Sequence, residues 1–189
     1  MVRFVTILAC LILSSLQADA QGKRAALVIG NSAYIHAGPL TNPRNDAADM
    51  IAALKERDFE VLEGLDLDKV AFDRKVRDFA RALTNAEVGV FFYAGHGLQV
   101  AGKNYLVPTD AELGTPEALD FEMIQLDIVQ RIMERQVPTN ILFLDACRNN
   151  PPGAQSCTRH GYAFCRNWDR SCAYGERGRH SDQFFHTAR

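Results

Sequence analysis

The sequence predicts an α/β fold, a three-layer α/β/α sandwich with a mainly parallel sheet. Short continuous apolar runs, typical of strands buried on both faces, alternate with segments whose apolar residues recur at helical spacing. This alternation spans residues 23–151, and strands that alternate with helices build a parallel sheet with helices on both faces. In such sheets ligands bind at the carboxyl ends of the strands, so the residues after each strand become the candidate site.

The first half of this region predicts two strands and two helices. "AALVIG" (25–30) is an apolar run ending in Gly, and "FEVLEG" (59–64) predicts a second strand. Between them, residues 41–56 predict a helix, with Asn42 placed to cap its first turn. Residues 68–83 predict an amphipathic helix with large apolar side chains along one face and charges opposite.

The second half predicts two further strands, a hairpin and a helix. "VGVFFYA" (88–94) is a buried strand that ends before the turn "GHG". Residues 98–108 alternate apolar and polar side chains around a glycine and predict a hairpin. Residues 127–135 predict a short helix capped by Asp127, and "NILFLDA" (140–146) predicts the last buried strand.

Global composition and the N-terminus bear on partners and location. The chain has 189 residues and a net charge of −2, so nothing global indicates a nucleic acid or an anionic membrane as partner. Residues 1–20 combine Arg3, an apolar stretch and small residues before Gln21, the order of a secretory signal peptide. We expect export to a periplasm or the medium and no stable membrane span. A retained anchor and a lipoprotein box at Cys10 are the alternatives.

Two strand ends carry residue types suited to nucleophilic catalysis. His96 lies in a Gly-His-Gly turn after one buried strand, and Cys147 ends another. Either residue alone is more often structural, because free Cys is among the most buried residue types. Neighbouring parallel strands would bring both to one edge of the sheet, where a Cys beside a His forms a thiolate–imidazolium pair. The pattern therefore predicts a cysteine nucleophile.

Four segments in order, "ALVIGNSAY", "NDAADMIAAL", "FFYAGHG" and "LDACRNNP", resemble the bacterial caspase-like and metacaspase-like cysteine peptidases. The resemblance covers about residues 23–151 and implies a caspase–haemoglobinase-like fold and a polypeptide substrate. It implies that Cys147 attacks the scissile carbonyl and that His96 protonates the leaving amine. It also implies an oxyanion hole made by the backbone N–H groups of Gly97 and Cys147.

The nucleophile segment reads Asp145-Ala146-Cys147, which is similar to metacaspases. That likeness implies an acidic specificity pocket lined by Asp46 and Asp145, and hence cleavage after Arg or Lys through charge-assisted hydrogen bonds. Asp46 also suits the first turn of a helix, and Asp145 also suits a turn at a strand end. Many metacaspases use calcium, which makes calcium the one candidate cofactor, although no calcium-binding cluster can be placed in the sequence. Oligomeric state is not predicted.

The tail, residues 152–189, breaks the pattern. It contains no Leu, Ile, Val or Met, although the family places two more strands after the catalytic Cys. We therefore expect the C-terminal strands to be missing, the strand 140–146 to keep an unpaired edge, and the tail to be disordered.

Three hypotheses account for the tail: out-of-frame translation, which the abrupt compositional break favours, a flexible tail, or a metal or disulfide module. The module would use Cys157, His160, Cys165 and Cys172. Two functions follow, a cysteine endopeptidase or an inactive or truncated caspase-like module that only binds. We expect this form of the chain to be a poor enzyme.

Overall fold

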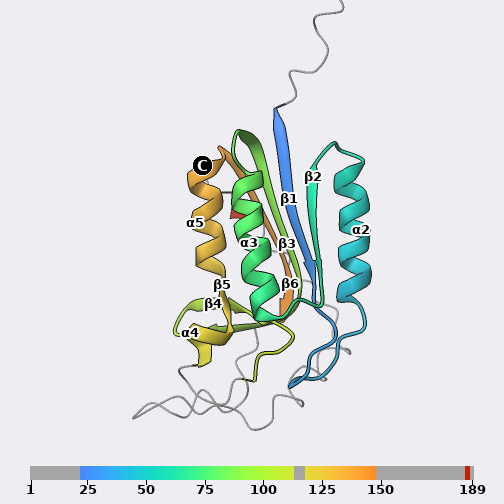
Figure 1. The fold of residues 1–189 in the computed structure, drawn as a ribbon, viewed down its shortest axis with the longest axis vertical. Coiled ribbons are helices and arrows are strands. Elements are labelled where there is room, and N and C mark those ends of the chain that lie inside the picture. The colour runs from blue at the N-terminus through green and yellow to red at the C-terminus, as the bar shows by residue number, and fades with distance from the viewer. Residues whose placement is uncertain (1–21, 113–117, 148–185, 188–189) are drawn as a thin grey trace, which may run out of the picture.

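The computed structural model describes residues 22–112, 118–147 and 186–187. It has three layers, with one sheet between two layers of helices (Figure 1). Helix α2 (Pro43–Lys55) covers one face, and α3 (Lys69–Ala82) and α5 (Leu126–Gln136) cover the other. This confirms the predicted α/β/α sandwich. The predicted signal peptide lies outside the described residues, as does the tail apart from residues 186–187.

The main sheet is parallel and has the strand order β2-β1-β3-β6. Its strands are β1 (Lys23–Gly30), β2 (Glu60–Leu65), β3 (Ala86–Val100) and β6 (Thr139–Cys147). Strand β1 is buried on both faces because its side chains alternate between two cores. Leu27 and Ile29 pack in the core under α3 and α5, and Ala26 and Val28 pack in the core under α2. Each predicted strand is therefore present.

The helices begin close to their predicted positions, but their caps differ. Asn42 occupies the N-cap of α2 without a side-chain cap bond, and its carbonyl accepts hydrogen bonds from the backbone N–H groups of Asn45 and Asp46. Helix α5 begins at Leu126 after Gln125, so the prediction that Asp127 caps it is wrong. Asp127 instead lies in the first turn, where the helix dipole favours a carboxylate.

Strand β3 continues beyond residue 94, where the sequence predicted its end. His96 therefore lies inside the strand and not in a loop. The reason is Gly95, whose φ of +156° is a conformation that glycine adopts without steric cost. The strand keeps pairing with β6 through His96 and then turns to a different partner.

That second partner is β4 (Lys103–Leu106), which pairs antiparallel with β3 from Gly97 to Val100. This confirms the predicted hairpin. Its turn residues, Ala101 and Gly102, have φ of 50° and 80°, as a two-residue hairpin turn requires. Two short elements were not predicted, α4 (Ala118–Glu122) and β5 (Ile124–Gln125), and β5 pairs with β4.

The outer edge of β6 is partly covered. Strand β7 (His186–Thr187) pairs antiparallel with it, opposite Ile141 and Leu142. The expectation that the edge stays unpaired is therefore wrong at these two residues. Strand pairing uses backbone N–H and C=O groups, so the tail needs no aliphatic side chains to supply it.

Candidate active site

The sheet brings the backbones of His96 and Cys147 together at its carboxyl edge. Strands β3 and β6 stay in parallel register from Val88 and Thr139 to His96 and Cys147, which are the last pair. Adjacent strands lie about 4.8 Å apart. The residues that the sequence placed at the ends of two strands are thus register partners, although they are 51 positions apart.

The backbone of His96 is fixed by two tyrosines. Its N–H donates to the Tyr34 hydroxyl at 2.8 Å, and its carbonyl accepts from the Tyr93 hydroxyl at 2.7 Å. The two hydroxyls lie 3.3 Å apart, and the Tyr34 ring lies 4.4 Å from the His96 ring, centroid to centroid. Gly95 is required here, because a Cβ at that position would lie 2.5 Å from the Tyr34 hydroxyl.

The His96 ring is oriented by a backbone carbonyl. Its Nε2 lies 2.8 Å from the carbonyl oxygen of Gly38. Because a carbonyl only accepts, Nε2 carries the hydrogen in this contact and Nδ1 is the basic nitrogen of the neutral ring. Burial lowers the pKa of His96, since it disfavours the charged form, and the bond to Gly38 partly offsets this effect.

The segment that supplies Tyr34 and Gly38 is itself anchored. The buried Asn31 accepts a bond from the Leu67 N–H at 2.9 Å and donates to the carbonyls of Leu67 and Val107. Asp66 accepts from the N–H groups of Ser32 and Ala33 at 2.7 and 3.0 Å. Sequence reasoning missed these positioning residues. The sequence feature that could have indicated them is the run of polar residues and Tyr34 directly after the buried strand at 25–30.

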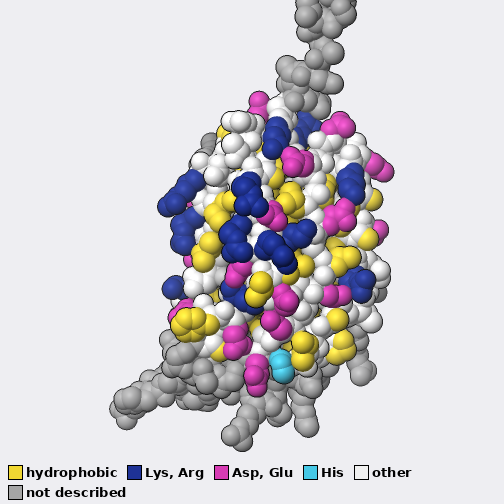
Figure 2. Space-filling model, viewed as in Figure 1, with side chains coloured by type: hydrophobic (Ala, Val, Ile, Leu, Met, Phe, Trp, Pro, Cys, Tyr) yellow, Lys and Arg dark blue, Asp and Glu magenta, His cyan; other side chains and the backbone are white. Residues whose placement is uncertain are grey.

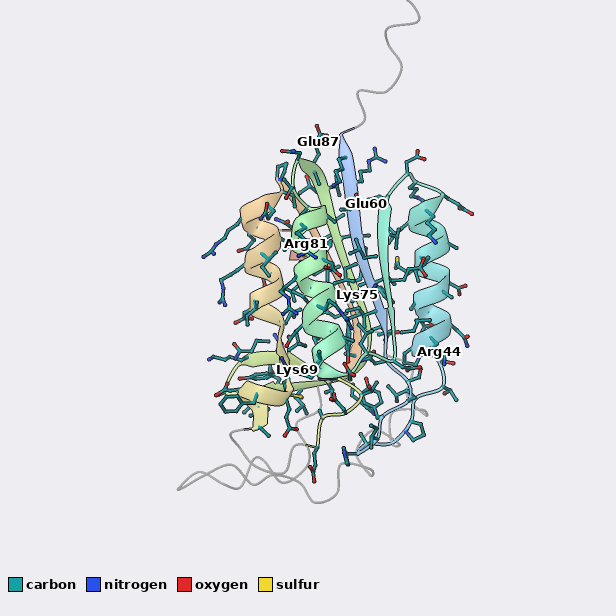
Figure 3. All side chains as sticks on the ribbon, viewed as in Figure 1. Arg44, Glu60, Lys69, Lys75, Arg81 and Glu87 are labelled. Atoms are coloured by element: carbon teal, nitrogen blue, oxygen red, sulfur yellow. The ribbon has the colours of Figure 1, made fainter. Side chains whose placement is uncertain are left out.

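Asp46 and Asp145 are close enough to interact. Asp46 is half-buried in the first turn of α2, and Asp145 is exposed on β6. The pKa of Asp46 is raised, first by its burial and then by the negative charges of Asp145 and Asp49. Arg44, at the foot of α2 in Figure 3, pairs with Asp66 at 3.1 Å. The negative charges of Asp46 and Asp145 therefore repel each other.

Gly97 follows His96 and pairs with Leu106 on β4. Gly97 and Ala146, the residue before Cys147, line the same small, mostly apolar hollow, together with Leu126 and Leu144. The sequence neighbours of His96 and Cys147 therefore line one hollow.

Neither a metal site nor a membrane span is found within the described ranges. No group of three or more His, Cys, Asp or Glu side chains there is arranged to hold a metal ion. No helix in this part of the chain is long and apolar enough to cross a membrane.

Comparison with known proteins gives a consistent result. A family model described as the caspase domain matches residues 23–184, past residue 151 where the sequence placed the end of the resemblance. The mucosa-associated lymphoid tissue lymphoma translocation protein 1 of Homo sapiens and its homolog in Mus musculus are each 30% identical to this chain over 125 residues. The matched stretch is 66% of this chain and 15% of either relative.

Proposed function

The chain belongs to the caspase domain family of cysteine peptidases, and on that basis we propose that it is an endopeptidase with a Cys147–His96 dyad. The observation that carries the proposal is the register of β3 and β6, which pairs these two residues at the carboxyl edge. That edge is where ligands bind in parallel α/β sheets. The ring orientation of His96 is the second support, because Gly38 leaves Nδ1 as the proton acceptor.

The mechanism follows from these groups. The thiol of Cys147 gives its proton to Nδ1 of His96, and the thiolate attacks the scissile carbonyl carbon. Negative charge then develops on the carbonyl oxygen, and the N–H groups of Gly97 and Cys147 stabilise it. The imidazolium of His96 protonates the leaving amine as the C–N bond breaks. Water, deprotonated by His96, hydrolyses the thioester and regenerates the thiol.

The proposed specificity is for Arg or Lys before the scissile bond. The pKa of Asp46 is raised first by its burial and then by repulsion from Asp145 and Asp49, and a bound guanidinium or ammonium group would relieve that repulsion. Arg44 does not neutralise the pair, because it is engaged with Asp66. Asp145 is exposed, so we expect Asp145→Ala to cost about 1 kcal/mol or less in kcat/KM for an Arg substrate.

The test is turnover of matched peptides that differ only in Arg, Lys or Asp before the scissile bond. We expect the wild-type chain, as a poor enzyme, to cleave the Arg and Lys peptides slowly, and Cys147→Ala to abolish turnover. The variant Cys147→Ala is expected to keep the same unfolding midpoint, which separates a lost nucleophile from a lost fold. Faster cleavage after Asp than after Arg would overturn the specificity. Turnover by Cys147→Ala would overturn the mechanism.

An electrophilic Arg peptide distinguishes a peptidase from a module that only binds. We expect it to label the wild-type chain at Cys147 and to leave Cys147→Ala unlabelled. Reversible binding without labelling would favour the binding module. The same assay with and without a chelator tests calcium dependence, and detection of a chain cleaved after Ala20 in the exported fraction tests the proposed signal peptide.

A further inference from the structure

The layer formed by α3 and α5 carries a charge opposite to that of the rest of the domain. The described residues contain 13 Lys and Arg and 18 Asp and Glu, a net charge of −5. The two helices contain seven of those cations and four of those acids, a net charge of +3. The remaining described residues therefore carry −8. Figure 2 shows Lys and Arg side chains gathered over this layer.

The two helices present the same outward pattern. On α3, the exposed Val70 is followed by the exposed Arg74 and Arg77, at four and seven positions. On α5, the exposed Ile128 is followed by the exposed Arg131 and Arg135, at three and seven positions. These spacings lie on one side of a helix, opposite the side that packs on the sheet.

The helices are neighbours and run in the same direction, so their patterns align. They contact each other, and both begin at the carboxyl edge of the sheet (Figure 1). The aliphatic residues in the two first turns lie at that edge, and the arginines extend away from it along both helices. We name this surface the α3–α5 face and define it by Val70, Arg74, Arg77, Ile128, Arg131 and Arg135.

The side chains of this face extend away from the described part of the domain. Val70 is 70% exposed and Ile128 is 43% exposed, which is unusual for β-branched aliphatic residues beside charges. The arginines of the face make no ion pair with any described residue, whereas Lys69 and Arg81 of α3 pair with Asp73 and Asp78. Exposed apolar residues rimmed by arginines are typical of interaction surfaces.

We propose that the α3–α5 face binds an acidic polypeptide segment that carries an apolar residue at the end nearest the carboxyl edge. Guanidinium groups match carboxylates in fork geometry, and the aliphatic pair supplies the apolar contact. From Val70 to Arg77 the helix rises about 10 Å, so a few extended residues span the face. The net charge of −2 of the whole chain gives no general attraction for a long polyanion, which favours a short acidic segment over nucleic acid or a membrane.

The experiment measures fluorescence anisotropy of a labelled peptide of Glu and Asp, about eight residues long with a terminal Leu, added to the full chain. A peptide with Gln and Asn in place of the acids is the ligand control. We expect the acidic peptide to bind, the amide peptide to bind far more weakly, and added salt to weaken binding.

Two double variants test whether the peptide binds to the α3–α5 face. We expect Arg74→Gln with Arg131→Gln to weaken binding roughly three- to thirtyfold. The matched control, Arg57→Gln with Lys103→Gln, removes the same charge from exposed positions off this face and should change affinity less than about twofold. Equal losses in the two variants would overturn the proposal.

Two further arms test the nature of the ligand. Val70→Ser with Ile128→Ser should reduce affinity for the Leu peptide to that of a peptide with Ser in place of Leu, and an unchanged affinity would overturn the apolar contact. Tighter binding of a DNA duplex or an anionic phosphatidylserine vesicle than of the acidic peptide would overturn the choice of a polypeptide. None of these variants alters the proposed catalytic residues, so turnover of Arg peptides should stay unchanged.

Discussion

Replacing Tyr34 with Phe should destabilise the domain more than replacing Tyr93 with Phe. Each substitution removes one buried hydroxyl of the pair that fixes His96. The Tyr34 hydroxyl is the acceptor of the buried His96 N–H, at 2.8 Å. The single hydrogen of the Tyr93 hydroxyl is shared between the carbonyls of His96 and Val107. Each carbonyl also keeps another donor, the Val107 N–H for His96 and the Asn31 side chain for Val107. The two phenylalanine variants therefore differ in what they leave unsatisfied.

The expected difference follows from the cost of a lost partner. Removing the acceptor of a buried N–H costs about 1–3 kcal/mol, whereas a hydrogen bond whose partners keep other bonds contributes about 0.5–1.5 kcal/mol. For a domain of this size 1 kcal/mol shifts the unfolding midpoint by roughly 3–5 °C. We expect Tyr34→Phe to lower the midpoint by roughly 3–15 °C, and Tyr93→Phe by less.

Thermal and urea unfolding of the full chain, followed by circular dichroism, measure this difference. An equal or larger loss in Tyr93→Phe would refute the reasoning, because it would mean that the His96 N–H does not depend on Tyr34. Turnover gives a second measurement. If the proposed dyad is correct, Tyr34→Phe should lower kcat more than it changes KM for an Arg peptide, since a displaced His96 misplaces the reacting atoms.

Three further predictions test particular features of the site. The pKa of Asp46 is raised. As the pH is lowered, KM for an Arg peptide should therefore begin to rise at a higher pH than it would if the pKa of Asp46 were that of an ordinary Asp, and Asp46→Asn should abolish this pH dependence. Burial lowers the pKa of His96, so the unfolded chain binds more protons below about pH 6.5, and stability should fall as pH decreases from there. His96→Gln should remove this contribution to the pH dependence of the unfolding free energy, which is at most about 1.4 kcal/mol per pH unit. Equal slopes of unfolding free energy against pH for the two proteins would contradict the prediction. Gly95→Ala should cost about 1–3 kcal/mol more than Gly102→Ala in unfolding experiments, because both residues have positive φ but only a Cβ at Gly95 meets neighbouring atoms.

The layers of the fold and the elements that carry the candidate site could be predicted from local sequence patterns. Apolar runs such as 25–30 and 140–146 are continuous because a central parallel strand is buried on both faces, and this requirement is visible in any short window of sequence. The same pattern predicted the sheet edge at which His96 and Cys147 lie, because the carboxyl ends of parallel strands all lie on one side of a sheet.

The contacts that hold His96 could not be predicted from local sequence patterns. Its bonds to Gly38 and Tyr34 join residues 58 and 62 positions apart, so no local pattern encodes them. The continuation of β3 through Gly95 also depends on a partner strand, because a Gly-His-Gly string reads locally as a turn. The partial cover of β6 by β7 uses backbone groups alone, which composition does not report. Burial patterns are local properties of a chain, whereas the contacts that orient the His96 ring depend on where the fold brings distant segments together.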